Sequence, residues 1–261
     1  MKKIFAALFS ILSLAAFCED SVICTLDGRS LKVESLAALP DSSLEYTLPG
    51  SKVRTKIARG QYLYARIPKP AEIEKADAFL KNGSFAQAAA SYKLAYDKYK
   101  LLGWDLYCIG HESEALAGLG EKQAALKKLE PMKNFELLDQ TRRPHLNYVQ
   151  RLRASLCVEL GKYKEVEPVL NSMAAGTDAS NAAFAFIRKG DILRRNGKLR
   201  EASQMYLQAS LLFPDVPERP EALAHLYTVL KELKDSNAEK FAGILRSEYP
   251  KDPWTKRMEK K

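Results

Sequence analysis

The spacing of apolar residues changes twice along this chain of 261 residues. Residues 4–17, IFAALFSILSLAAF, form one uninterrupted apolar run. From Ser21 to about Ile67, apolar and polar residues alternate, which is the period of half-buried strands. From Ala71 onward the period is that of amphipathic helices, and Ala, Leu, Lys and Glu predominate. The pattern therefore predicts a leader, a short β segment and a long helical region.

The leader has the layout of a secretory signal peptide. Lys2 and Lys3 precede the apolar run, and Glu19 and Asp20 follow it. A cationic start before a short apolar run is typical of a signal peptide, and 14 residues are fewer than the about 20 that a spanning helix needs. We therefore expect residues 1–18 to be a signal peptide and the protein to be exported, to the periplasm or envelope or into the medium. An uncleaved membrane anchor is the alternative.

The end of the leader offers two cleavage patterns. Ala15 and Ala16 are small residues suited to cleavage, and Ala16-Phe17-Cys18 is a second possibility. Cys18 raises the question of a lipoprotein, because the lipid is attached to a cysteine at the new N-terminus. The residue before such a cysteine should be small, and here it is the bulky Phe17. Contact with a membrane is thus expected only through a lipid on Cys18, or transiently through the signal peptide.

The β segment is punctuated by two turn signals. Asp27-Gly28 between two alternating runs predicts a tight hairpin, because Gly tolerates the positive φ of a primed turn. Pro49-Gly50 marks a second turn, after which residues 53–57 alternate apolar with cationic side chains and residues 61–67 are rich in aromatics. Four or five short strands within residues 19–68 predict a small β domain, either an open sheet or an SH3-like barrel. It is small enough that we expect it to pack on the helical region.

The helical region repeats itself. Steps of 37, 41 and 36 residues separate Gly83, Gly120, Gly161 and Gly197. Each of these glycines is followed five residues later by a small or medium apolar residue, and four residues after that by a bulky apolar one. Repeats of this length predict a solenoid, in which no unit buries its apolar face without a neighbour. The longer step of 41 residues predicts a longer loop around residues 139–145 (DQTRRPH).

At these positions the sequence resembles the tetratricopeptide repeat (TPR) family. The fourth unit matches best, through Phe186, Gly190, Leu193, Ala202, Tyr206, Ala209 and Pro214. The first unit matches through Ala76, Phe79, Ala88, Tyr92 and Ala95, and a degenerate fifth unit begins near Glu218. The resemblance implies a mainly α fold, a TPR-like α-solenoid of four to five helix hairpins over residues 69–252. Residues 253–261 then form a cationic tail, either a frayed terminus or a binding tail.

The overall charge is moderately positive. The chain has 41 Lys and Arg against 32 Asp and Glu, and loss of Lys2 and Lys3 with the signal peptide leaves a formal charge of +7. This excess is compatible with anionic partners but does not diagnose nucleic acid, and export argues further against that partner. Arg54, Lys56 and Arg59 predict either a basic contact face on the β segment or an ordinary solvated face.

Few residues suggest catalysis or metal binding. His111, His145 and His225 are far apart, and Ala115 stands where a helical zinc-protease motif beginning at His111 requires its second ligand. The remaining cysteines lie among apolar residues at wide separations, which favours buried single thiols over a disulfide framework: they are Cys24, Cys108 and Cys157. We therefore expect no enzymatic activity, no metal and no cofactor.

The TPR resemblance implies that one face of each first helix lines an inner groove. In the third and fourth units this places seven residues near the groove: Tyr148, Arg151, Phe184, Ile187, Asp191, Arg194 and Arg195. Arginine can form paired hydrogen bonds with a carboxylate, so an extended peptide or an acidic C-terminus is a natural ligand. The asparagines of the family's carboxylate-clamp subclass are not evident. A solvated cationic helix face is the plainer interpretation of the same residues.

The sequence therefore predicts an exported scaffold that binds a protein or an extended peptide in the cell envelope. The alternative, suggested by the charge of +7 and the basic strand, is a protein that binds the cell wall or an anionic glycan. No particular oligomeric state is predicted.

Overall fold

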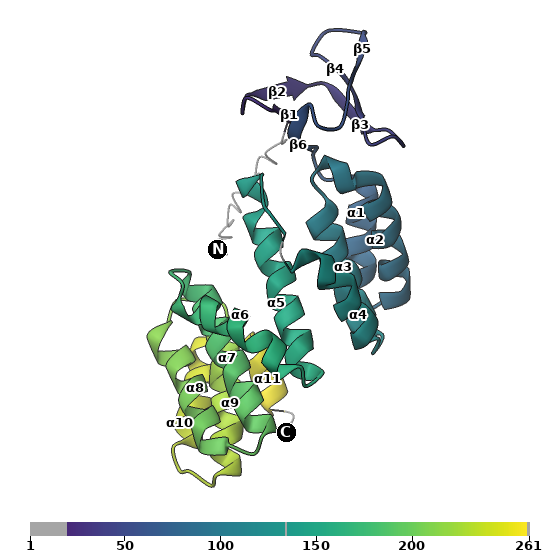
Figure 1. Ribbon diagram of the computed structural model, residues 1–261. Coiled ribbons are helices and arrows are strands. Elements are labelled where there is room, and N and C mark those ends of the chain that lie inside the picture. The colour runs from purple at the N-terminus through teal and green to yellow at the C-terminus, as the bar shows by residue number, and fades with distance from the viewer. Residues whose placement is uncertain (1–19, 134, 260–261) are drawn as a thin grey trace, which may run out of the picture.

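The computed structural model describes residues 20–133 and 135–259. The predicted signal peptide and Cys18 lie outside the described residues. Figure 1 shows the β segment at one end of the molecule, with the helical hairpins following it toward α10 at the other end.

The β segment contains six strands in two antiparallel sheets, ordered β2-β1-β6 and β3-β4-β5. The predicted run after Asp27-Gly28 is interrupted at Glu34, so that its first half pairs with β1 and its second half with β4. One bent segment shared between two small sheets is the arrangement of an SH3-like barrel, which was one of the two predicted forms. The strands are β1 (Ser21–Thr25), β2 (Ser30–Val33), β3 (Ser35–Ala38), β4 (Leu44–Thr47), β5 (Arg54–Ile57) and β6 (Tyr62–Arg66).

The rest of the described chain is helical and forms five hairpins, which confirms the predicted solenoid. The hairpins are α1 (Ala71–Lys81) with α2 (Phe85–Tyr99), α3 (Asp105–Gly118) with α4 (Lys122–Leu129), α5 (Arg143–Glu159) with α6 (Tyr163–Ala175), α7 (Ala179–Arg195) with α8 (Leu199–Leu212), and α9 (Arg219–Glu232) with α10 (Ala238–Glu248). Three short 3-10 helices join them: η1 (Lys100–Leu102), η2 (Glu130–Met132) and η3 (Gln140–Arg142).

The turn inside each hairpin has one residue with positive φ. In the first four units it is the predicted glycine, as at Gly197 with φ of 75°. In the fifth unit Lys234 takes this place, with φ of 57°. A left-handed residue ends a helix while satisfying its last carbonyl groups, and Gly adopts it without strain. The fifth unit is thus degenerate in sequence but keeps the geometry of the others.

Within each hairpin, small residues let the helices approach closely. A Cβ placed on Gly190 would lie 2.5 Å from Cε1 of Tyr206, so only glycine fits against this ring. Ala202, Tyr206 and Ala209 are completely buried on α8, as Ala88 and Tyr92 are on α2. The residues that carry the TPR resemblance therefore make the packing that the resemblance implies.

The barrel shares its core with the first helices. Ile23 and Tyr62 of the barrel belong to the same apolar cluster as Ile73 of α1. The indole N–H of Trp104 donates a hydrogen bond to the carbonyl oxygen of Ile67 at 3.1 Å. The β segment is therefore packed on the helical region, as its small size predicted.

The C-terminal segment differs from the predicted cationic tail. Residues 253–259 form α11 (Pro253–Glu259), which contacts α9 and α10. Thr255 and Met258 are buried, and the Thr255 hydroxyl donates a hydrogen bond to the carbonyl oxygen of Tyr249 at 2.6 Å. This short helix covers the end of the last hairpin, where a solenoid would otherwise expose apolar surface.

Candidate binding surface

The first helices of successive units contact one another along the stack, from α1 through α3, α5 and α7 to α9, and α9 contacts α11. We call the side of the stack that these first helices form the inner surface. Two clusters of polar and aromatic side chains lie on this surface, one near each end of the helical region.

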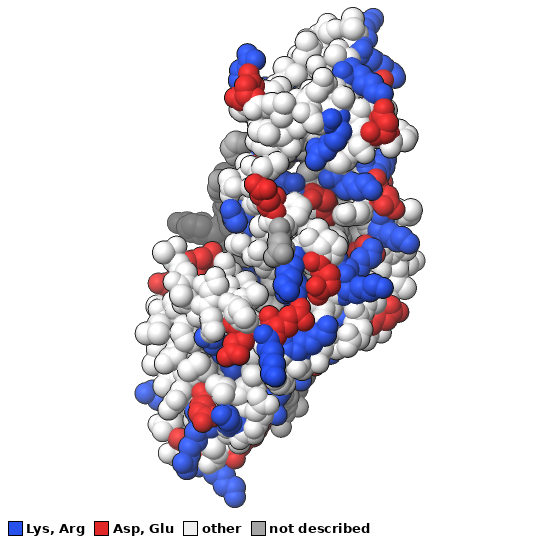
Figure 2. All heavy atoms as spheres, in the orientation of Figure 1, with Lys and Arg blue, Asp and Glu red and all other residues white. Residues whose placement is uncertain are grey.

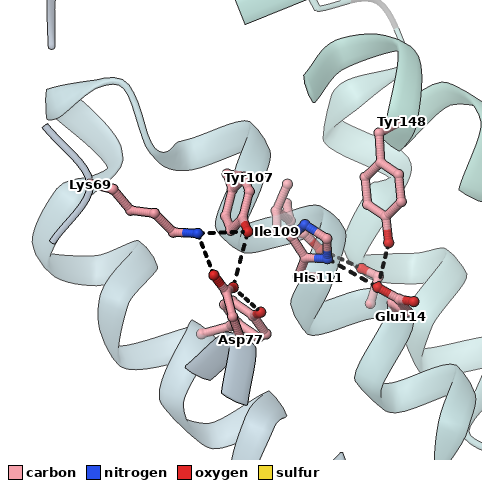
Figure 3. A network of polar contacts seen from close by, with 9 residues as sticks. Lys69, Asp77, Tyr107, Ile109, His111, Glu114 and Tyr148 are labelled. Carbon is pink, nitrogen blue, oxygen red and sulfur yellow. Dashed lines mark hydrogen bonds and ion pairs between the residues drawn. The ribbon is translucent and has the colours of Figure 1, made fainter. Parts of the chain in front are cut away.

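The N-terminal cluster is built around the carboxylate of Asp77 on α1 (Figure 3). Oδ1 of Asp77 accepts hydrogen bonds from the hydroxyls of Tyr92 at 2.5 Å and Tyr107 at 3.0 Å. Lys69 pairs with the same carboxylate and also donates to the hydroxyl of Tyr107 at 3.2 Å. Burial raises the pKa of Tyr92, so its hydroxyl remains a donor at physiological pH.

The same cluster continues across α3 to α5 through His111 (Figure 3). Nδ1 of His111 lies 3.0 Å from Oε2 of Glu114, which also accepts a hydrogen bond from Tyr148 at 2.6 Å. The rings of Tyr107 and Tyr148 lie 4.3 and 4.7 Å from the His111 ring. The hydrogen bond from His111 lowers the pKa of Glu114, although burial opposes the shift. Aromatic rings thus pack on both sides of this imidazole.

The C-terminal cluster is built around Asp191 on α7. Oδ1 of Asp191 accepts a hydrogen bond from the hydroxyl of Tyr206 at 2.8 Å and lies 3.0 Å from Nδ1 of His225, while Oδ2 lies 2.8 Å from Nη1 of Arg188. Arg188 also pairs with Glu221 of α9. Burial by itself would raise the pKa of Asp191, but the close approach of His225 and the charge of Arg188 outweigh it and lower this pKa. The Asp191 carboxylate is therefore held ionised.

The two clusters contain the same three residue types at the same spacing. In each, a Tyr follows an Asp by 15 residues and a His follows the Tyr by 19 residues. The Tyr and His rings are 5.5 Å apart in the first cluster and 5.1 Å apart in the second. The two sets are Asp77, Tyr92 and His111, and Asp191, Tyr206 and His225. Each set ties one unit to the next, so that the first and second units correspond to the fourth and fifth.

The clusters differ in how their surroundings are filled. In the N-terminal cluster the ring of Tyr107 packs on His111. In the C-terminal cluster the corresponding residue is Glu221, at the same offset in the sequence that relates Asp77 to Asp191. A pocket of about 480 Å³ lies at the C-terminal cluster, lined by α5, α7, α9 and α11. Its wall includes the indole of Trp254, whose ring lies 5.1 Å from that of His225. The second helices of the hairpins do not contribute to the lining, so this pocket belongs to the inner surface.

The structure brings three of the seven predicted groove residues together in this pocket, namely Asp191, Arg194 and Arg195. Ile187 is different, because it is completely buried in the core between α7, α8 and α9 and presents nothing to a ligand. Tyr148 belongs to the N-terminal cluster through its hydrogen bond with Glu114.

The remaining predicted residues form a bridge between α5, α7 and α9. Phe184 is buried, and the guanidinium groups of Arg151 and Arg188 lie 4.7 and 5.3 Å from its ring centre. The cationic groups that lie over the Phe184 ring are therefore those of Arg151 and Arg188. Arg151 pairs with Glu218 and donates a hydrogen bond to the carbonyl oxygen of Ser180 at 3.1 Å. These contacts connect neighbouring units.

The predicted positive charge is largely paired. Arg194 forms an ion pair with Glu232, and Arg151 forms one with Glu218. Arg195 is exposed and forms no ion pair with another described residue. Of the three predicted arginines, Arg195 is therefore the one that an anionic group of a partner can reach without breaking an existing pair.

Six residues of the pocket were missed by the sequence reasoning: Val158, Glu159, Arg188, Glu221, His225 and Trp254. The recurrence of Asp, Tyr and His at identical spacing was present in the sequence and would have indicated His225. Trp254 was assigned to the tail, and nothing in its local sequence shows that α11 folds back onto α9.

The basic face predicted on the β segment is also mostly paired. Nη1 of Arg54 lies 3.2 Å from Oε1 of Glu45, and Nζ of Lys56 lies 2.7 Å from Oδ2 of Asp41. Figure 2 shows Lys and Arg side chains interspersed with Asp and Glu over the visible face of the molecule. The net charge is therefore not gathered into one field of a single sign on that face.

The described cysteines are buried single thiols, as predicted: Cys24, Cys108 and Cys157. Burial raises the pKa of Cys108 to about 12, so this thiol stays protonated and unreactive near neutral pH. Within the described ranges, the structure contains no group of three His, Cys, Asp or Glu residues placed to hold a metal ion. No helix in this part of the chain is long and apolar enough to cross a membrane.

No protein-family profile and no curated protein matches the chain. Among solved structures, MamA residues 41-end from Desulfovibrio magneticus RS-1 is 19% identical, with 71% of this chain and 99% of that chain covered and a TM-score of 0.47. A tetratricopeptide repeat protein from Parabacteroides merdae ATCC 43184 is 18% identical, with 72% and 70% covered and a TM-score of 0.44. The class of the protein follows from its own packing: it is an α-solenoid of TPR-like hairpins preceded by an SH3-like barrel.

Proposed function

We propose that the chain is an interaction scaffold whose inner surface binds a partner protein or an extended peptide segment. The observation that carries this proposal is the pocket of about 480 Å³ at the C-terminal cluster, which the first helices and α11 line together. The equivalent position of the N-terminal cluster is packed with tyrosine rings. The C-terminal part of the inner surface is therefore the part that offers room for a ligand.

The lining of the pocket suits a peptide. Trp254 supplies an aromatic wall, and the guanidinium of Arg195 is exposed and free of ion pairs with described residues. A carboxylate of the partner, from an acidic side chain or a C-terminus, is the natural counterpart of Arg195. Buried aromatic and arginine side chains are also the residues that most often dominate the energy of protein interfaces.

We infer that binding rather than catalysis is the function. The acidic and imidazole groups of both clusters bind to one another: Asp191 with His225, and Glu114 with His111. Each cluster ties neighbouring units of the solenoid together, which is a structural use of these side chains. The thiol of Cys108 is buried and protonated.

We further propose that this scaffold acts in the cell envelope after export. The support is the sequence of residues 1–18, with its cationic start and short apolar run. Mass spectrometry of the mature protein tests this step, and cleavage at the end of the leader is the expected result. A diacylated Cys18 at the new N-terminus would show attachment to a membrane, and an intact Met1 would contradict a cleaved signal peptide and favour the uncleaved anchor.

The binding proposal is tested by charge reversal on the two sides of one hairpin. Arg195→Glu changes the pocket, and Arg200→Glu makes the same change on α8, outside the pocket. We expect Arg195→Glu to abolish co-purification of envelope proteins that the wild-type chain retains, and Arg200→Glu to leave it unchanged. Equal recovery of partners by both variants would contradict a binding site in this pocket.

Binding to an anionic glycan is less well supported as the main function. Its motivation was the charge of +7 and the basic strand, and two of the three cations on that segment pair with Glu45 and Asp41. Sedimentation of the protein with purified peptidoglycan separates this alternative from the scaffold, because it predicts salt-sensitive binding.

A further inference from the structure

A second cavity, of about 330 Å³, lies at the junction between the SH3-like barrel and the helices. Three segments that are distant in sequence line it: β6 with the turn before it, the end of α2 with η1 and the start of α3, and residues 135–142 between the second and third units. The last segment belongs to the longer step of the repeat. Arg66 of β6 donates a hydrogen bond to the hydroxyl of Thr141 at 3.0 Å, and Arg142 pairs with Asp105 of α3. The longer loop is thus bound to both the barrel and the helices.

Three buried side-chain polar atoms at this junction have no hydrogen-bond partner among the described residues. The side chain of Asp139 is 1% exposed, and its Oδ1 accepts hydrogen bonds from the backbone N–H and the hydroxyl of Thr141. Its Oδ2 accepts none from a described residue, and Nε of Arg66 and Nε of Arg142 donate none. Buried polar atoms in folded proteins nearly always have partners. Asp139 and Arg142 therefore form a buried polar part of the cavity wall.

The cavity also has an apolar wall that reaches the surface. Tyr62 is buried, Phe135 is half-buried, and Leu138 is 52% exposed although it is a large apolar side chain. Because the exposed member of this wall is aliphatic, it suits an apolar side chain of a ligand. It is less suited to a sugar ring, which would stack on the open face of an aromatic residue.

Unpaired positive charge lies at the rim. Arg59 and Lys100 both line the cavity, both are exposed, and neither forms an ion pair with a residue in the described part of the chain. The Arg59 guanidinium lies 5.2 Å from the ring centre of Tyr62, and the Lys100 ammonium lies 5.7 Å from that of Tyr96. Among the described residues, the rim carboxylate that also forms no ion pair is that of Glu136. Two unpaired cations thus face one unpaired carboxylate, so the rim is positive overall.

We propose that this junction cavity binds a short peptide segment of a partner protein in which an acidic residue adjoins an apolar one. The acidic side chain lies against Arg59 and Lys100, and the apolar side chain lies on Leu138 and Phe135. Ligand sites often occur where two structural parts meet, because each part contributes one wall. This site is separate from the inner surface, and either one can exist without the other.

An array of short synthetic peptides tests the proposal with the purified full-length chain. The peptides carry one Glu and one Leu at varied spacing, with counterparts in which Lys replaces Glu or Ser replaces Leu. We expect binding, measured by fluorescence anisotropy, to require both residues. Arg59→Glu combined with Lys100→Glu should weaken it by about tenfold or more, because two attractive charges become repulsive.

The matched control makes the same two charge changes away from the cavity, with Lys52→Glu in the barrel and Lys93→Glu on α2, both of which are exposed. This control should bind as the wild type does. Leu138→Ser supplies an independent variant at an exposed position, and it should weaken binding without altering the thermal unfolding of the protein. Three results would overturn the proposal: binding that ignores Glu and Leu, equal affinity in the cavity variants and the control, or retention of soluble peptidoglycan fragments but of none of the peptides.

Discussion

The hydroxyl of Tyr206 on α8 donates a hydrogen bond of 2.8 Å to the carboxylate of Asp191 on α7. Three units earlier, the hydroxyl of Tyr92 donates the equivalent bond to Asp77, at 2.5 Å. In both hairpins the bond joins the second helix to the first. The same carboxylate in the fourth unit also meets His225 of the following unit. One buried acid thus holds its own hairpin together and connects it to the next.

Removal of one such bond should destabilise the fold measurably. Tyr206→Phe leaves the buried carboxylate of Asp191 without one donor, and we expect a loss of about 1–2 kcal/mol in the free energy of unfolding, measured with urea. Tyr163→Phe is the control, because the Tyr163 hydroxyl has no hydrogen-bond partner among the residues that the structure describes. An equal loss in both variants would show that the Tyr206 bond has no special weight.

The close approach of α7 and α8 predicts a second pair of variants. Gly190→Ala places a Cβ 2.5 Å from the Tyr206 ring, and we expect it to cost about 1–3 kcal/mol because the helices must separate. Gly243→Ala, in the interior of α10, meets no atom within 4 Å. Since Ala is the better helix former, this control should be neutral or stabilising by up to about 1 kcal/mol. A larger loss of thermal stability in Gly243→Ala than in Gly190→Ala would contradict this prediction.

His145 at the start of α5 should make stability depend on pH below neutrality. Burial, and then the charges of Arg142, His111 and Lys69, lower the pKa of His145 below its ordinary value of 6.5. As the pH falls below that value the unfolded chain takes up the proton first, so the free energy of unfolding should decrease.

This decrease is measurable by urea unfolding at about pH 7.5 and about pH 5.5, where the ordinary carboxylates are still ionised. His145→Gln, which cannot be protonated, should lose less stability between the two conditions than the wild type. An identical loss in both proteins would assign the effect to other groups.

The C-terminal helix should contribute to stability as a cap. Met258→Ala removes a buried side chain from the core that α11 shares with α9, and we expect a loss of about 1–3 kcal/mol. Lys256→Ala changes an exposed neighbour on the same helix and should have little effect. Equal unfolding midpoints for the two variants would mean that α11 does not act as a cap.

The features that the sequence predicted correctly depend on short-range geometry. The glycine at each turn, and the small residues facing Tyr206, serve contacts within one hairpin, so their spacing alone identifies them. The fifth unit was harder to recognise because Lys234 replaces the turn glycine. The interruption at Glu34, which divides one predicted strand between two sheets, depends on the closure of the barrel and not on any local signal.

The binding surface was predicted less well for a related reason. Helical periodicity places Ile187 near Phe184 and Asp191, but it does not show which side of α7 faces α9. The pairing of Arg151 with Glu218, which removes a predicted ligand contact, joins residues 67 positions apart. Such pairings arise from the stacking of units and cannot be obtained from one helix at a time.

Site-specific photo-crosslinking in intact cells tests directly whether the inner surface binds a partner protein. A benzophenone amino acid in place of Arg195 probes the pocket on the inner surface, and the same amino acid in place of the exposed Gln204 probes α8 on the other side of the hairpin. We expect a discrete covalent adduct with another protein from position 195 and none from position 204. The absence of an adduct from position 195, or identical adducts from both positions, would contradict this expectation.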